Sequence, residues 1–126
     1  MVLPAFNEAD NIAASVRRAR DVLTQRDADF EIIVVDDGSS DATRRIVDGL
    51  TSQDRRVRCL HHPRNRGYGA ALRTGLLAGV KDLVFFTDAD LQFELAEIDK
   101  LLQHAQHFDI IAGYRAHRRD PLPRKV

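Results

Sequence analysis

Short apolar runs alternate with amphipathic stretches along the chain. The apolar runs are rich in β-branched and aromatic residues, which favour strands. They occupy residues 1–3, 30–35, 57–60, 83–86 and 108–112. Nearly continuous apolarity of this kind is typical of strands that are buried on both faces of a sheet.

Between these runs, apolar residues recur three or four positions apart, which places them along one side of a helix. The spacing predicts helices around residues 12–23, 43–50, 69–78 and 98–105. Asp41 stands where it could cap the second of these helices, and Gly75 lowers the helix propensity of the third by about 1 kcal/mol. The repeated strand-helix alternation predicts an α/β fold with a mainly parallel sheet, right-handed crossovers and helices on both faces.

Composition fits one compact domain over residues 1–126, with 44% hydrophobic and 30% charged residues. Neither an uncharged apolar stretch long enough to span a membrane nor a signal peptide is visible, so we expect a cytoplasmic protein. Lys and Arg number 19 and Asp and Glu number 19, and this balance argues against a nucleic-acid-binding protein. The single cysteine, Cys59, excludes an internal disulfide and is expected to be an inert core residue.

Acidic residues follow two of the predicted strands. Asp36 and Asp37 come directly after residues 30–35, and Asp88 and Asp90 follow residues 83–86. Ligands collect at the carboxyl ends of parallel strands, and two carboxylates two positions apart can hold a hard cation such as Mg²⁺ or Mn²⁺. A solvated turn is the alternative interpretation of either pair. Since side chains alternate along a strand, we expect Asp37 to face the ligand and Asp36 to be structural, with the reverse orientation as the alternative.

Two further loops could contribute to a site. Residues 4–8 follow the first strand, and Glu8 there could simply favour the start of a helix. Residues 65–71 contain two glycines and could cradle a phosphate on backbone N–H groups, or form an ordinary turn. His61 and His62 end a strand without metal-binding spacing and are interpreted as surface or packing residues.

Taken in order, five segments resemble family 2 glycosyltransferases of the GT-A fold, and most closely their polyprenyl-phosphate branch. The segments are residues 3–8 (LPAFNE), 34–41 (VVDDGSSD), 65–71 (NRGYGAA), 87–93 (TDADLQF) and 113–115 (GYR). The resemblance implies an enzyme with a Rossmann-like GT-A fold that moves a sugar from a nucleotide-diphosphate sugar to an acceptor. A polyprenyl phosphate is the expected acceptor, and a divalent metal is expected to assist departure of the nucleotide.

The resemblance also implies roles for individual residues of this chain, grouped here by the part of the donor that each would contact. Pro4, Phe6 and Glu8 would contact the nucleotide base, and Val35 and Asp37 would contact the base and the ribose. Asp88, Ala89, Asp90 and Gln92 would contact the diphosphate, and Arg115 and Arg124 would lie on the nucleotide-sugar side. Asp88, Asp90 and Gln92 are the implied ligands of Mg²⁺ or Mn²⁺. Asp90 and Arg115 are the implied catalytic residues.

Compared with the family, the chain corresponds to the nucleotide-sugar half of an incomplete domain, followed by a basic tail. The tail, residues 115–126, holds five basic residues against one acidic residue. We expect it to face the phosphates of the donor and of a membrane-borne acceptor, with peripheral contact at the inner face of the membrane.

Three alternatives remain at this point. The first is a nucleotide- and metal-binding fragment that is inactive alone. The second is a phosphoacceptor receiver domain, although the acidic pair follows the second predicted strand where a receiver places it after the first. The third is a dinucleotide-binding oxidoreductase, although residues 4–7 stand where that fold needs a glycine-rich turn.

Overall fold

The computed structural model describes residues 1–90 and 94–113. It contains two compact units, Met1–Leu95 and Ala96–Val126, and each is described by itself. Gln92, Arg115, Arg124 and the basic tail 115–126 lie outside the described residues.

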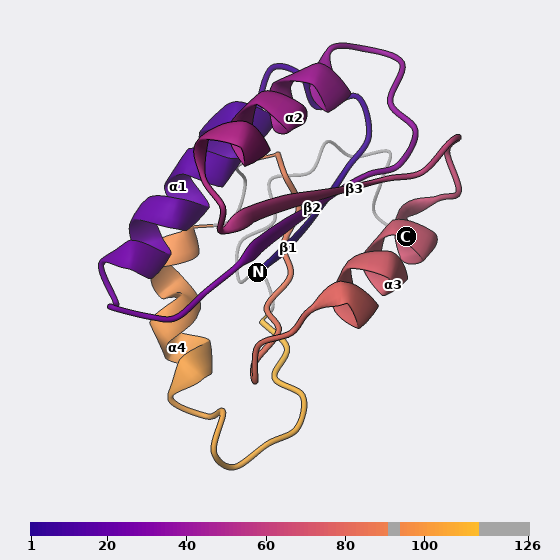
Figure 1. Ribbon diagram of the computed structural model, residues 1–126. Coiled ribbons are helices and arrows are strands. Elements are labelled where there is room, and N and C mark those ends of the chain that lie inside the picture. Colours follow the sequence, from indigo (N-terminus) through magenta and orange to yellow (C-terminus); the bar gives the residue numbers. More distant parts are fainter. Residues whose placement is uncertain (91–93, 114–126) are drawn as a thin grey trace, which may run out of the picture. The chain divides into compact units, whose positions relative to one another are not determined.

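The first unit is built on a parallel sheet of three strands, β1 (Val2–Ala5), β2 (Ile32–Asp36) and β3 (Val57–His61), in the order β1-β2-β3 (Figure 1). The register pairs Ala5 with Asp36 and Asp36 with His61. All three strands therefore end at the same level of the sheet. The predicted parallel sheet is confirmed, and each strand lies within two residues of its expected position.

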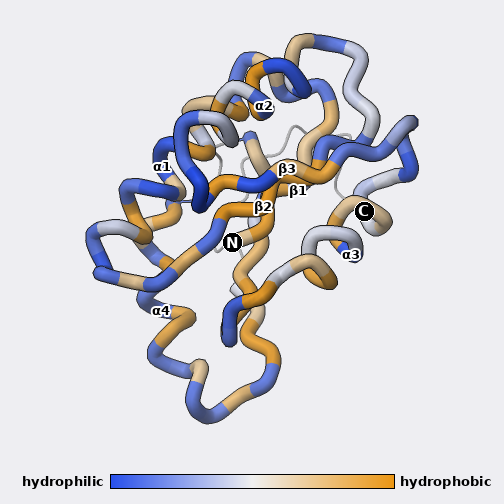
Figure 2. Tube along the Cα trace, in the orientation of Figure 1, coloured by the Kyte–Doolittle hydropathy of each residue, from blue (hydrophilic) through white to orange (hydrophobic). Residues whose placement is uncertain are grey.

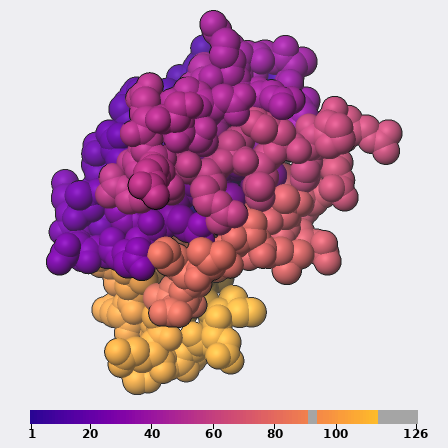
Figure 3. All heavy atoms as spheres, in the orientation of Figure 1, coloured from indigo at the N-terminus to yellow at the C-terminus, as the bar shows by residue number. Residues whose placement is uncertain are grey.

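Helices cover both faces of the sheet, as the sequence predicts. The helices α1 (Ile12–Thr24) and α2 (Thr43–Gln53) lie on one side, and α3 (Tyr68–Ala78) lies on the other (Figure 1). Apolar residues concentrate along the strands (Figure 2). β1 and β2 are buried along their whole length, and side chains cover them in the space-filling view (Figure 3).

Gly75 allows α3 to approach the sheet closely. A Cβ atom at this position would lie 2.3 Å from Cγ1 of Val2 and 3.1 Å from Cγ2 of Val35. Both valines are fully buried and form a core cluster with Ile33 and Ala71. The low helix propensity of Gly75 is therefore offset by packing that a larger residue would obstruct.

Three expectations need correction. Residues 83–86 form a single parallel bridge from Phe86 to Val2, supported by a hydrogen bond of 2.8 Å from Val2 N to Phe85 O, and do not form a full strand. Residues 108–112 are not a strand, and Ile110 is 88% exposed. A strand needs a hydrogen-bonding neighbour, and the described residues supply none for this segment. Asp41 does not occupy the N-cap of α2, which is Ala42, but its Oδ1 accepts a hydrogen bond of 2.9 Å from Thr43 N.

The second unit is small. A 3-10 turn, η1 (Leu95–Glu97), begins at the last residue of the first unit and leads into the helix α4 (Ile98–Leu102), which ends three residues earlier than predicted. Across the described residues, none of the helices combines the length and apolarity needed to cross a bilayer.

Candidate functional site

A cavity of about 570 Å³ opens in the first unit beside the carboxyl end of β1. Its volume lies within the range typical of small-molecule sites. The lining residues come from the end of β1, four separate loops and the start of α3: Pro4, Ala5, Phe6, Glu8, Asp37, Asn65, Tyr68, Ala71, Asp88, Ala89 and Asp90. The fold thus brings together acidic and aromatic side chains that are distant in sequence.

Most of the predicted site residues that the structure describes line this cavity. Val35 is the exception, because its side chain is fully buried in the core beneath α3. Four lining residues, Ala5, Asn65, Tyr68 and Ala71, were not predicted individually, although the last three belong to the glycine-containing segment that is a phosphate-binding candidate.

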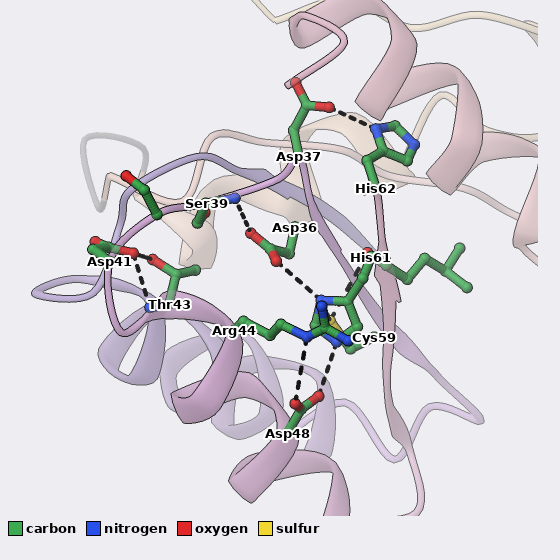
Figure 4. A network of polar contacts seen from close by, with 12 residues as sticks. Asp36, Asp37, Ser39, Asp41, Thr43, Arg44, Asp48, Cys59, His61 and His62 are labelled. Atoms are coloured by element: carbon green, nitrogen blue, oxygen red, sulfur yellow. Dashed lines mark hydrogen bonds and ion pairs between the residues drawn. The ribbon is translucent and has the colours of Figure 1, made fainter. Parts of the chain in front are cut away.

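Asp36, the last residue of β2, and Asp37, which follows it, point to opposite sides of the sheet (Figure 4). Asp36 lies on the side of α2, where its Oδ2 is 3.0 Å from Nδ1 of His61 and its Oδ1 accepts a hydrogen bond of 3.1 Å from Ser39 N. Nε2 of His61 lies 2.9 Å from Oδ1 of Asp48 in α2. Asp36 is 1% exposed and holds the end of the sheet to α2.

Asp37 lies on the side of α3 and lines the cavity. Its Oδ1 is 2.5 Å from Nδ1 of His62 and accepts a hydrogen bond of 3.0 Å from Arg66 N. Its Oδ2 accepts a hydrogen bond of 2.8 Å from Gly67 N, and Nε2 of His62 lies 3.0 Å from Oγ1 of Thr74. Burial raises the pKa of Asp37, but the hydrogen bonds from His62 and the two backbone N–H groups together lower that pKa below its usual value. Asp37 is therefore a carboxylate at neutral pH.

The paired histidines are thus part of a polar network, which their interpretation as surface or packing residues did not capture. The register of β2 and β3 sets Asp36 beside His61, so Asp37 and His62 follow as the next pair. The sequence does contain a signal for these contacts, because an acidic pair and a histidine pair stand at the ends of two neighbouring parallel strands.

The loop after β1 is tied to the loop after β2. Asn7 adopts a positive φ of 55°, and its Oδ1 accepts a hydrogen bond of 2.9 Å from Ser40 N. Asn7 N donates to Ser39 Oγ at 2.9 Å, and Glu8 N donates to Thr43 Oγ1 at 2.9 Å. These bonds hold Phe6 and Glu8 at the cavity without using their side chains.

Gly38 allows a second close approach between loops. It has a φ of +72°, and a Cβ atom there would lie 2.3 Å from the backbone carbon of Arg64 and 2.6 Å from Asn65 N. Only glycine fits both the conformation and the space. The turn after β2 therefore packs directly on the loop that carries Asn65 to the cavity.

The segment containing Asp88, Ala89 and Asp90 is held from two sides. Ser15 Oγ in α1 donates a buried hydrogen bond of 2.6 Å to Ala89 O, and the Tyr68 hydroxyl at the start of α3 bonds to Asp88. Burial and the Asp88 carboxylate raise the pKa of Tyr68 to about 12. Both aspartates line the cavity, so their carboxylates offer the hard oxygen ligands that Mg²⁺ and Mn²⁺ prefer.

A second group of ligand-type side chains lies away from this cavity. Ligand atoms of Asp48, Cys59 and His61 lie within 4.8 Å of one another. Both ring nitrogens of His61 already face carboxylates, and burial, followed by Asp36 and Asp48, raises the pKa of Cys59 to about 12. Cys59 is half-buried and carries a protonated thiol, so the group is best described as a hydrogen-bonded cluster that anchors α2.

Comparison with known proteins gives a consistent result. The family model described as Glycosyl transferase family 2 matches residues 1–125. An undecaprenyl-phosphate 4-deoxy-4-formamido-L-arabinose transferase from Pectobacterium carotovorum is 33% identical over 128 residues, covering 100% of this chain and 39% of the relative. The protein of the same name from Pseudomonas fluorescens is 34% identical and is covered to 37% of its length. The chain therefore spans about two fifths of the length of these curated relatives.

Solved structures agree on the fold. A mannosyltransferase from Pyrobaculum calidifontis in complex with GDP-Man and Mn²⁺ has a TM-score of 0.66 and 26% identity, covering 76% of this chain and 28% of that one. TarS 1–349 from S. aureus has a TM-score of 0.60 at 23% identity, covering 84% of this chain and 32% of that one. The architecture is that of part of a GT-A domain, as expected.

These matches overturn two of the alternatives raised by the sequence, the receiver domain and the dinucleotide-binding oxidoreductase. The strand ends, the cavity and the family match over residues 1–125 lead to one assignment. The chain belongs to glycosyl transferase family 2.

Proposed function

We propose that the chain binds the donor of a sugar transfer reaction, in which a sugar moves from a nucleotide-diphosphate sugar to a polyprenyl phosphate. The observation that carries the proposal is the cavity that gathers Phe6, Glu8 and Asp37 with Asp88 and Asp90. The relatives named as undecaprenyl-phosphate sugar transferases support the acceptor class, and the neighbour in complex with GDP-Man supports the donor class.

Within the cavity, we assign the nucleoside to Pro4, Phe6, Glu8 and Asp37. Phe6 is 44% exposed at the cavity and offers an aromatic face to a base. Glu8 is held in place by a hydrogen bond of 2.9 Å from Asn11 Nδ2 to its Oε2. Val35 contributes the core beneath the site, since its side chain is buried.

We assign the diphosphate to Asp88, Ala89 and Asp90, which line the same cavity. A divalent cation fits here because two anionic side chains alone would repel a diphosphate, and the neighbour with GDP-Man also holds Mn²⁺. We assign Mg²⁺ or Mn²⁺ to Asp88, Asp90 and Gln92, where the ion would neutralise charge on the departing diphosphate.

Transfer to a phosphate acceptor requires little further catalysis from the protein. A phosphate acceptor already carries an anionic oxygen, so transfer to the sugar needs correct positioning but no strong general base. Asp90 is the proposed catalytic residue within the described part of the chain. Arg115 and Arg124 are proposed to contact the phosphates of the nucleotide sugar, where their charge would favour the leaving group.

The basic tail 115–126 is proposed to face the phosphate of a membrane-borne acceptor at the inner face of the membrane. Anionic vesicles at low salt should retain the protein and release it as ionic strength rises, since each basic residue near the surface contributes about 1 kcal/mol. Replacing Arg118, Arg119, Arg124 and Lys125 with serine should abolish retention. Unchanged retention would show that the tail is not what holds the protein on anionic vesicles.

Sugar transfer is tested directly with a radiolabelled nucleotide sugar and undecaprenyl phosphate in detergent. The expected result is label in the lipid fraction, which depends on a divalent cation and is lost in Asp90→Asn. The chain spans about two fifths of its curated relatives, which favours one alternative, a fragment that binds nucleotide and metal without transfer. Donor binding with no lipid-linked product would support that alternative.

A further inference from the structure

The backbone around Asp88 is fixed by hydrogen bonds on both sides of this residue. Thr87 N donates a hydrogen bond of 3.2 Å to Val2 O in β1, and Ala89 O accepts one of 2.6 Å from Ser15 Oγ in α1. Ala89 is 2% exposed, whereas Asp88 is exposed at the cavity. The fold therefore sets the position of Asp88, but the direction of its carboxylate depends on contacts of the side chain itself.

Tyr68 is the partner of this carboxylate in the described part of the chain. Its hydroxyl bonds to Asp88, and the tyrosine is the donor because a carboxylate can only accept. A tyrosine hydroxyl keeps its proton near neutral pH, so the contact adds no negative charge to the cavity. A carboxylate offers about four acceptor positions, and one hydroxyl leaves most of them for a cation.

Tyr68 is itself held in place through the start of α3. Gly67 precedes it with a φ of +91°, and Gly67 N donates a hydrogen bond of 2.8 Å to Oδ2 of Asp37. Ala71 follows in α3, is 1% exposed and belongs to the core cluster beneath this helix. A tyrosine side chain has few rotatable torsions and loses little freedom when it is held. The ring is therefore a rigid support that reaches from α3 to Asp88.

We infer that Tyr68 is a positioning residue for the divalent cation, because its hydroxyl holds the Asp88 carboxylate in the orientation that binds the metal. The inference rests on the proposed function, which assigns the cation to Asp88 and Asp90. Tyr68 and Asp88 both line the cavity, so a carboxylate held by the hydroxyl stays at the cavity. Without the hydroxyl, cation binding would have to order an exposed side chain that is free to take other rotamers, and this ordering opposes binding.

Two other roles for Tyr68 lead to different results. A residue that contacts the nucleotide directly would affect nucleotide binding with and without metal. A residue that mainly stabilises the fold would lower the melting temperature when it is changed. Tyr68 is 53% exposed and Asp88 is exposed, so their hydrogen bond contributes little to stability.

The test is titration calorimetry with UDP or GDP, whichever the unmodified chain binds more tightly, over a series of MnCl₂ concentrations and in EDTA. The measured quantity is the MnCl₂ concentration that gives half of the maximal gain in nucleotide affinity. Loss of a residue that orients a metal ligand typically weakens metal binding by about tenfold to a hundredfold, and the lower value applies because both partners are exposed. This midpoint should rise about tenfold in Tyr68→Phe, whereas nucleotide affinity in EDTA should not change.

An unchanged midpoint in Tyr68→Phe would overturn the inference while leaving the proposed function intact. Equal losses of nucleotide affinity in MnCl₂ and in EDTA would overturn it as well, because they would show that Tyr68 contacts the nucleotide. If MnCl₂ did not raise nucleotide affinity in the unmodified chain, the proposed cation would fail and the inference with it.

Two further variants show whether Tyr68 acts through Asp88. Asp88→Asn should raise the midpoint at least as much as Tyr68→Phe, since a positioning residue cannot contribute more than the ligand that it positions. Ser52→Ala is the matched control, because it removes an exposed hydroxyl from α2 that does not line the cavity. A larger effect in Tyr68→Phe than in Asp88→Asn, or an equal effect in Ser52→Ala, would overturn the inference. A lower melting temperature of Tyr68→Phe with an unchanged midpoint would assign the hydroxyl a structural role instead.

Discussion

Replacement of Gly38 by alanine is the sharpest test of how the cavity is assembled. At the φ of +72° seen here, an L-residue is strained by about 1–2 kcal/mol. The added Cβ would also lie 2.3 Å from the backbone carbon of Arg64 and 2.6 Å from its Cα, so the loop carrying Asn65 must move. Such displacement typically costs about 1–3 kcal/mol. Gly38→Ala should therefore destabilise the protein by about 2–5 kcal/mol.

Urea unfolding followed by circular dichroism measures this loss. Gly49→Ala is the matched control, because Gly49 lies in the interior of α2 with nothing within 4 Å of its Cβ position. That control should stabilise the protein by about 0.5–1 kcal/mol, since alanine is the better helix former. The two glycine-to-alanine changes should thus have opposite signs.

Gly38→Asn separates the two contributions. Asparagine tolerates a positive φ better than alanine does, but its Cβ meets the same backbone atoms. If close contact dominates, as the distances indicate, asparagine will not restore stability. A Gly38→Ala protein within about 0.5 kcal/mol of the wild type would refute this account of the loop packing.

Three further predictions concern the surroundings of the site. The lowered pKa of Asp37 contributes stability that is present above the ordinary aspartate pKa of about 4 and is lost as pH falls below it, so Asp37→Asn should lose less unfolding free energy between about pH 5 and about pH 3 than the wild type. Equal losses in urea titrations would contradict this. Ser15→Ala removes the buried bond to Ala89 O and should cost about 1–2 kcal/mol, whereas Ser52→Ala, at an exposed helix position, should stay within about 0.5 kcal/mol; similar values for both would argue against the role of Ser15. Because the pKa of Cys59 is raised to about 12, only about one thiol in ten thousand is ionised at about pH 8, so iodoacetamide should modify Cys59 far more slowly in the native protein than in urea. Equal rates would show that the thiol is not shielded.

The main elements of the fold could be predicted from sequence because their signals are local. Apolar runs of strand length gave β1, β2 and β3, and three-and-four spacing gave α1, α2 and α3. The two strand predictions that failed both concern pairing. Residues 83–86 and 108–112 have strand-like composition, but composition carries no information on whether a neighbouring strand is available.

The residues of the candidate site could be predicted where a sequence motif identifies a loop at the end of a strand. The opposite orientation of Asp36 and Asp37 follows from strand alternation, and the structure shows it. The contacts of His61 and His62 depend on the register between two strands separated by α2, and that register is set by tertiary packing. The roles assigned to Gln92, Arg115 and Arg124 stay predictions.

The claim that Asp88 and Asp90 hold a cation that in turn holds a nucleoside diphosphate is tested most directly by titration calorimetry with UDP. Binding in MnCl₂ should be at least about tenfold tighter than in EDTA, a difference of about 1.4 kcal/mol. Asp90→Asn should abolish that difference, whereas Asp82→Asn should preserve it, since Asp82 is exposed and does not line the cavity. UDP binding of equal strength in MnCl₂ and in EDTA would contradict the account.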